Sequence, residues 1–221
     1  MIRAGSSADR PARHLPAERS RVHAVRSLVV AAVGLGVTTL SAIPRSISAA
    51  EARLFRAVNG LSGAIEWPLW VVMQTGALLA IPVVALLAFL VRRRLRPALD
   101  LLVAGTTGWL LAKVMKDLLQ RGRPAAFFDD VNVRGSLGGG NDQGLGFPSG
   151  HATVAFALAI VTFPYISFRS RAVAVVVAAV VGFSRMYFGA HLPLDVLGGA
   201  ALGVAIAAGV HLFMDLTTHH H

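Results

Sequence analysis

Two histidines and one aspartate in the second half of the chain have the types and spacing of a catalytic group. His191 and Asp195 are four residues apart, so on a helix their side chains would share one face and touch. An aspartate that accepts the N–H of an imidazole fixes its tautomer and leaves the other ring nitrogen free to attack an electrophile. His151 would then give a proton to the leaving oxygen. These residues predict nucleophilic catalysis.

Basic and small polar residues accompany the two histidines. Arginine presents a planar fork and lysine a point charge to an anion, and the amides at a helix N-terminus also bind oxyanions. Such a set favours an anion with several charged oxygens, and phosphate fits it best. The expected phosphate-binding residues are Lys116, Arg123, Ser149, Gly150 and Arg185.

Taken one at a time, these residues have structural explanations that are more common than the functional one. The His191–Asp195 pair could be an ordinary pair on a helix surface. Lys116 could be an interfacial cation whose stem lies against apolar surface, and Arg185 could anchor a helix at the interface. Ser149 could be only a helix cap. Their joint spacing favours the functional explanation.

The composition indicates the scaffold that must hold these side chains. The chain has 221 residues, of which 55% are hydrophobic and 14% charged, and its mean hydropathy is +0.63. These values are typical of an integral membrane protein. Since about 20 apolar residues cross a bilayer as a helix, the apolar runs predict six membrane helices, at 27–44, 67–91, 98–117, 149–168, 172–185 and 191–216. We therefore predict an all-α bundle, with a short interfacial helix after Ser48 between the first two spans.

The charges exclude some partners and suggest an orientation. The formal net charge is +10, but the arginines punctuate apolar runs instead of covering a soluble face, so we expect lipid headgroups and no nucleic acid as partners. Cysteine is absent, which excludes disulfides and thiolate chemistry. Arginines accumulate before the first span, after the second and after the fourth, and such loops stay in the cytoplasm. The N- and C-termini would then be cytoplasmic, and the candidate site would face outward from the cell membrane.

Both ends of the chain are expected to lie outside the membrane domain, which would comprise residues 27–216. Residues 1–26 are polar, basic and without apolar periodicity, which predicts a disordered cytoplasmic tail. A cleaved signal peptide fits less well, because the apolar run starts late. Residues 217–221 would form a C-terminal tail, whose closing histidines are similar to the remnant of a purification tag.

Three motifs resemble the signature of the type 2 phosphatidic acid phosphatase family. Lys116 is followed by six residues and then Arg123-Pro124. Pro148-Ser149-Gly150-His151 forms the second motif, and Ser184-Arg185, five residues, His191, three residues and Asp195 form the third. The motifs occur in the family's order over residues 116–195, and the hydropathy pattern extends the resemblance over residues 27–216.

The resemblance implies a metal-independent phosphohydrolase without a cofactor, which acts on lipid phosphates or diphosphates. His191 would form a phosphohistidine, Asp195 would orient it, and His151 would be the general acid. Fixed cations would stabilise the transferring group in place of Mg²⁺. The phosphoryl oxygens would be held by Lys116, Arg123, Ser149, Gly150 and Arg185. Small family members act on polyprenyl diphosphates or phosphatidylglycerophosphate, and phosphatidic acid is also compatible; we prefer a carrier-lipid diphosphate.

Three alternatives accompany this interpretation. A lipid phosphotransferase would use the same covalent intermediate with another acceptor, and the sequence does not separate the two. A non-catalytic lipid-phosphate binder would keep the cationic pocket, but the two histidines with Asp195 disfavour it. Asp129, Asp130 and Asp142 could form a metal cluster, but a solvated loop explains them better. The sequence carries no prediction of oligomeric state.

Overall fold

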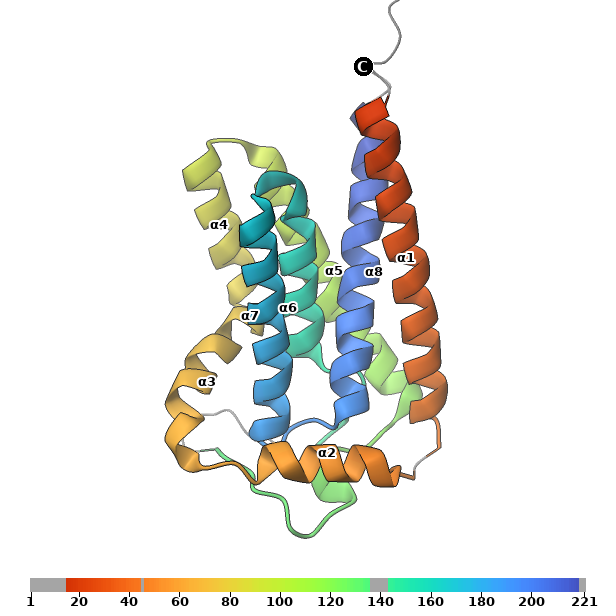
Figure 1. The fold of residues 1–221 in the computed structure, drawn as a ribbon, viewed down its shortest axis with the longest axis vertical. Coiled ribbons are helices and arrows are strands. Elements are labelled where there is room, and N and C mark those ends of the chain that lie inside the picture. The colour runs from red at the N-terminus through yellow and green to blue at the C-terminus, as the bar shows by residue number, and fades with distance from the viewer. Residues whose placement is uncertain (1–14, 45, 136–142, 219–221) are drawn as a thin grey trace, which may run out of the picture.

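The computed structural model describes residues 15–44, 46–135 and 143–218, with side chains described from residue 21 to residue 213 outside the gaps. Its regular elements are helical, which confirms the all-α prediction, and the long ones run parallel or antiparallel in one bundle (Figure 1). The helices are α1 (Leu15–Ala42), α2 (Ala49–Asn59), α3 (Glu66–Met73), α4 (Ala80–Arg92), α5 (Leu95–Leu119), α6 (Gly150–Val161), α7 (Phe168–Tyr187) and α8 (Pro193–Thr218).

Four of the described helices are long and apolar enough to cross a membrane. They are α1 from Arg21, α5, α7, and α8 as far as Phe213. The segment Gly63–Gly76 together with α4 forms a fifth candidate, bent by 73°. The fourth predicted span, over 149–168, corresponds to a shorter apolar segment, Gly150–Tyr165. Because α6 packs against α5, α7 and α8, other helices surround it instead of lipid.

The predicted span over 67–91 is not one straight helix. The helix breaks around a 3-10 turn at Gln74–Gly76, and the chain resumes as α4. A side chain on Gly76 would place its Cβ 2.6 Å from the carbonyl oxygen of His151, so the turn packs directly against the first turn of α6. Pro82, which has no N–H to donate, sits in the first turn of α4, where a helix tolerates it. The break thus brings the turn at Gln74–Gly76 close to the candidate site.

The predicted boundary of the N-terminal tail is wrong. Residues 15–26 belong to α1, although they were expected to be disordered. They include good helix formers such as leucine, alanine, glutamate and arginine, with no glycine and with a proline only in the first turn, so helix propensity extends the apolar span backwards. The tail's residues 1–14 lie outside the described part of the chain, as do residues 219–221. At the other end α8 reaches Thr218, two residues beyond the predicted limit.

The short helix after Ser48 is confirmed as α2. The Ser48 hydroxyl accepts a hydrogen bond from the backbone N–H of Glu51 at 3.1 Å and so caps the helix. In Figure 1 α2 lies across the end of the bundle, roughly at right angles to the long helices. Its buried face carries Phe55 and Val58, together with the carboxylate of Glu51. The helix therefore covers the bundle end to which the candidate residues belong.

Helices α6 and α8 approach each other through glycines. A Cβ on Gly199 would lie 2.5 Å from the carbonyl oxygen of Ser149, and one on Gly203 would lie 2.5 Å from that of Thr153. Such contacts leave no room for a side chain, so the backbones touch directly. This packing fixes the start of α6 against the first turns of α8.

We expect Gly203→Ala to destabilise the protein. The new methyl would also lie 2.8 Å from the backbone nitrogen of Ala157, and overpacking of this kind costs about 1–3 kcal/mol. Gly209→Ala in the same helix is the matched control, because its Cβ would meet no atom within 4 Å. A thermal unfolding midpoint that falls for Gly203→Ala and stays constant for Gly209→Ala is the expected result; equal midpoints would contradict the close packing.

Candidate active site

The candidate residues come from four parts of the fold that meet at one end of the bundle. Lys116 lies in the last turn of α5, and Arg185 in the last turn of α7. Ser149 is the N-cap of α6, and Asp195 lies in the first turn of α8. These residues lie together because α5 and α7 end at the same end of the bundle at which α6 and α8 begin (Figure 1).

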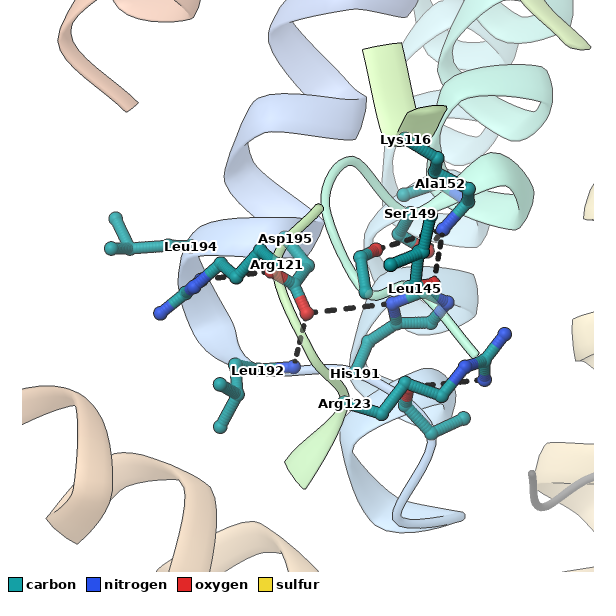
Figure 2. A network of polar contacts seen from close by, with 12 residues as sticks. Lys116, Arg121, Arg123, Leu145, Ser149, Ala152, His191, Leu192, Leu194 and Asp195 are labelled. Carbon is teal, nitrogen blue, oxygen red and sulfur yellow. Dashed lines mark hydrogen bonds and ion pairs between the residues drawn. The ribbon is translucent and has the colours of Figure 1, made fainter. Parts of the chain in front are cut away.

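His191 and Asp195 were expected to share a helix face, but the structure arranges the pair differently. Helix α8 begins at Pro193, so His191 lies in the loop before it. The Nδ1 atom of His191 lies 3.5 Å from Oδ2 of Asp195, and both side chains are buried. The same carboxylate oxygen accepts a hydrogen bond from the backbone N–H of Leu192 at 2.9 Å (Figure 2). Asp195 therefore anchors the loop that carries His191 and lies against the Nδ1 side of its imidazole, so Nε2 remains for chemistry.

His191 is held in its neutral form. Burial is the largest cause that lowers its pKa well below the ordinary range, followed by the positive charges of Lys116, Arg185 and Arg123 and by His151. These four groups therefore lie close enough to the imidazole to act on its charge. A neutral imidazole has a lone pair, so the environment favours a nucleophile over a permanent cation.

Backbone carbonyls and one sulfur atom position the three cations. The ammonium of Lys116 donates to the carbonyl oxygens of Leu145 at 2.8 Å and Gly146 at 2.9 Å (Figure 2). The Nη1 atom of Arg123 donates to the carbonyl oxygen of Ala190 at 3.2 Å. Nη1 of Arg185 lies 2.9 Å from the sulfur of Met73 in α3. The cations are thus oriented before any anion arrives.

The start of α6 is bound to the start of α8 and leaves an open space beside it. The Ser149 N–H donates to the carbonyl oxygen of Asp195 at 2.8 Å, and the Ser149 hydroxyl accepts from the N–H of Ala152 at 3.5 Å. A Cβ on Gly150 would meet no atom within 4 Å. The N-terminal amides of α6 therefore border open space at Gly150, and such amides can bind an oxyanion.

Arg121 and Glu51 belong to the site, although the sequence analysis did not select them. Nη1 of Arg121 donates to Oδ1 of Asp195 at 2.8 Å, and its Nη2 donates to Oε2 of Glu51 at 2.9 Å. Oε1 of Glu51 also accepts from the N–H of Leu194 at 3.0 Å. All three charged side chains are buried. Arg121 therefore links α2 to Asp195 in α8.

A sequence signal for Glu51 existed in the pattern of α2. Glu51, Phe55 and Val58 follow helical spacing, so the carboxylate shares the apolar face of the helix. A carboxylate on a face that will be buried needs a cationic partner. Arg121 carried no comparable signal, because it precedes Arg123 by two residues and only the latter fits the recognised motif.

Two of the three acidic residues considered as a metal cluster lie in the described part of the chain. Asp130 pairs with Arg56 at 3.3 Å on the exposed surface, and Asp142 lies outside the described residues, as do the glycines at 138–140. Within the part of the chain that the structure describes, no group of three or more His, Asp or Glu side chains could hold a metal ion.

The sequence is similar to one family of known proteins. The sequence pattern of the PAP2 superfamily matches residues 97–218. Phosphatidylglycerophosphatase B of Bacillus subtilis is 34% identical over 129 residues, which make up 53% of this chain and 58% of that protein. Undecaprenyl-diphosphatase BcrC of Bacillus subtilis is 37% identical over 73 residues, 32% of this chain and 36% of its own length. The alignments thus cover less than two thirds of these relatives.

The fold also has a counterpart among solved structures. The crystal structure of a transmembrane PAP2 type phosphatidylglycerolphosphate phosphatase from Bacillus subtilis superimposes with a TM-score of 0.60 and 25% identity. The superposition covers 85% of this chain and 95% of that one.

Proposed function

The chain belongs to the PAP2 superfamily and is an integral multi-pass membrane protein, and from this premise we propose that it hydrolyses lipid phosphates or diphosphates without a metal ion. The observation that carries the proposal is a buried His191 whose Nδ1 faces Asp195 at 3.5 Å, with Lys116, Arg123 and Arg185 close enough to lower its pKa. Such a set supplies a nucleophile together with fixed positive charge for a phosphoryl group.

In the first step Nε2 of His191 attacks phosphorus, and a P–N bond forms as the bond from phosphorus to the leaving oxygen breaks. Asp195 stabilises the imidazolium character that develops, because its carboxylate faces Nδ1. His151 gives a proton to the leaving oxygen. Lys116, Arg123 and Arg185 bind the equatorial oxygens, and the Ser149 hydroxyl and the Gly150 amide complete the cradle.

In the second step water attacks the phosphohistidine, and the P–N bond breaks to release inorganic phosphate. His151, which has lost its proton in the first step, accepts one from this water. Charge on the transferring group is balanced throughout by fixed cations, the role that Mg²⁺ has in many phosphoryl-transfer enzymes. His191 then returns to its neutral state.

We propose a carrier-lipid diphosphate, such as a polyprenyl diphosphate, as the preferred substrate, with phosphatidylglycerophosphate and phosphatidic acid as the other candidates. The names of the relatives, an undecaprenyl-diphosphatase and a phosphatidylglycerophosphatase, support both leading classes. The site lies where candidate membrane helices end, so the phosphate of a lipid can reach it while the chain stays in the bilayer.

We also propose six crossings, with both termini in the cytoplasm and the site facing outward. Helix α6 connects the end where α5 stops to the end where α7 starts, which supports its role as a short crossing (Figure 1). Three basic segments lie at the bundle end opposite to His191. They are the described start of α1, the arginines between α4 and α5, and the arginines at the start of α7. Positive charge at one end favours a cytoplasmic location for it.

Phosphate release by the detergent-purified protein in EDTA tests the proposed function. We expect release from polyprenyl diphosphate, phosphatidylglycerophosphate and phosphatidic acid, fastest from the first. Lys116→Ala should abolish it. Lys113→Ala is the matched control, because the Lys113 side chain is exposed and lies over the ring of Trp109 at 4.7 Å. Release that requires added Mg²⁺, or no release from all three lipids, would contradict the proposal.

His151→Ala should slow hydrolysis by an amount that depends on the leaving group. An alkoxide leaving group needs a proton far more than a phosphate leaving group does, because its conjugate acid is much weaker. We therefore expect a loss of about 10²–10⁴-fold for a lipid monophosphate and a clearly smaller loss for a lipid diphosphate. Initial rates on phosphatidic acid and polyprenyl diphosphate measure the two values; equal losses would argue against a general-acid role.

A further inference from the structure

A cationic cavity lies at the opposite end of the bundle from His191. It is lined by α1 and α8 on one side and by the α4–α5 junction and the α6–α7 connection on the other, and its volume is about 1210 Å³. In Figure 1 these segments occupy the upper end of the bundle, whereas α2 and the candidate active site occupy the lower end. The cavity is therefore separate from the site described above.

Positive charge dominates the polar lining of this cavity. One acidic residue, Asp100, is among its lining residues, and the Oδ2 atom of Asp100 accepts a hydrogen bond from the hydroxyl of Tyr165. The basic lining residues are Arg92, Arg94, Arg96, Arg171, His23 and His211. Four guanidinium groups against one carboxylate leave an excess of positive charge that an anion would neutralise.

The contacts of two of the arginines show how the cavity is arranged. Arg92 donates from Nη2 to the carbonyl oxygen of Tyr165, so it ties α4 to the α6–α7 connection. The guanidinium of Arg171 lies 5.6 Å from the centre of the Phe163 ring. Guanidinium groups such as these form strong, charge-assisted hydrogen bonds with phosphate oxygens.

Most of the remaining lining is apolar. Val91, Ile160 and Val204 contribute to it from the helices, and Phe163 from the α6–α7 connection. An anionic head beside an apolar wall, at the end of the candidate spans, matches an amphiphile better than a free ion. Basic pockets between membrane helices bind the headgroups of anionic phospholipids in this way.

We propose that this cavity binds the phosphate headgroup of an anionic membrane phospholipid, with its acyl chains along the apolar wall. The bound lipid joins α1 and α8 to the remaining helices at the bundle end opposite to His191. The arginines at the α4–α5 junction and at the start of α7 are the groups that hold the phosphate.

Native mass spectrometry of the detergent-purified protein tests the proposal, with dioleoylphosphatidylglycerol as the probe and dioleoylphosphatidylcholine as the zwitterionic reference. We expect the wild-type protein to retain the anionic lipid preferentially. The double variant Arg94→Gln/Arg171→Gln should bind it about 30-fold more weakly, since each arginine near a lipid phosphate contributes a several-fold gain in affinity. Equal retention of the two lipids by the wild-type protein would overturn the proposal.

The double variant Arg93→Gln/Arg169→Gln is the matched control. It removes the same charge from the same two segments, but neither residue lines the cavity and both are exposed. It should retain the anionic lipid as the wild-type protein does, and so should His191→Ala, which separates this cavity from the active site. Equal weakening by the two double variants would overturn the proposal in favour of diffuse surface attraction.

Further controls show whether a loss of lipid binding reflects the cavity itself. The thermal unfolding midpoint in lipid-free detergent reports whether Arg94→Gln/Arg171→Gln folds, and Arg94→Gln alone, at an exposed N-cap, provides a milder variant that should show part of the loss. Millimolar inorganic phosphate should not displace the lipid adduct. Displacement by inorganic phosphate would show that the cavity takes the free ion, and would overturn the lipid assignment.

Discussion

Replacing His191 with alanine should lower phosphate release by about 10⁴-fold or more, because removal of the nucleophile closes a covalent pathway. His191 is 2% exposed and its Nδ1 faces Asp195, so the alanine variant leaves the cations without the imidazole that Asp195 contacts. Initial rates of phosphate release in EDTA measure the effect. The loss should be the same for monophosphate and diphosphate lipids, since both use the same nucleophile.

The His191→Ala protein must also be shown to fold. Loss of a buried neutral imidazole leaves a cavity but no unpaired charge, so a monodisperse protein with a modestly lower thermal midpoint is expected. A folded variant that keeps a tenth or more of the wild-type rate would show that His191 is not the nucleophile.

Replacing Arg121 with methionine should destabilise the protein by about 3–5 kcal/mol, the usual cost of leaving buried charges without their partner. Both Glu51 and Asp195 would lose their counter-charge, and Arg121 itself is 1% exposed. Unfolding in mixed micelles of increasing denaturing detergent gives the free energy. Activity should fall as well, because Asp195 would be less firmly held against His191.

Arg56→Met is the matched control for this prediction. Arg56 pairs with Asp130 at 3.3 Å, but the two side chains are 54% and 66% exposed, and exposed pairs contribute about 0–1 kcal/mol. The double variant Glu51→Gln/Arg121→Met should recover part of the lost stability, since one of the two stranded carboxylates is then neutral. Equal effects of Arg121→Met and Arg56→Met would refute the structural role of the buried network.

Much of the candidate site could be predicted from the sequence because its residues lie at helix ends. Lys116, Ser149, Arg185 and Asp195 each flank an apolar run, and the order of spans decides which ends meet. The spacing did not predict the backbone conformation at His191. This residue lies in a loop that Asp195 binds through the N–H of Leu192, and not on a helix face.

Other features depend on tertiary contacts that no local pattern encodes. Arg121 meets Glu51 across 70 positions in the sequence, and the bend before α4 follows from close packing of Gly76 on the carbonyl of His151. The early start of α1 reflects helix propensity outside the apolar run, which a hydropathy window does not detect. The cationic cavity likewise forms only when α1 and α8 stand opposite the α4–α5 junction.

The central claim is that a phosphoryl group passes through His191. A lipid diphosphate labelled with ³²P in its terminal phosphate, mixed with the protein and quenched in alkali, which preserves the acid-labile P–N bond, tests it directly. We predict label on the peptide that contains His191, and none on the His191→Ala protein. Release of labelled phosphate with no label on the protein, or with label on another residue, would contradict the account.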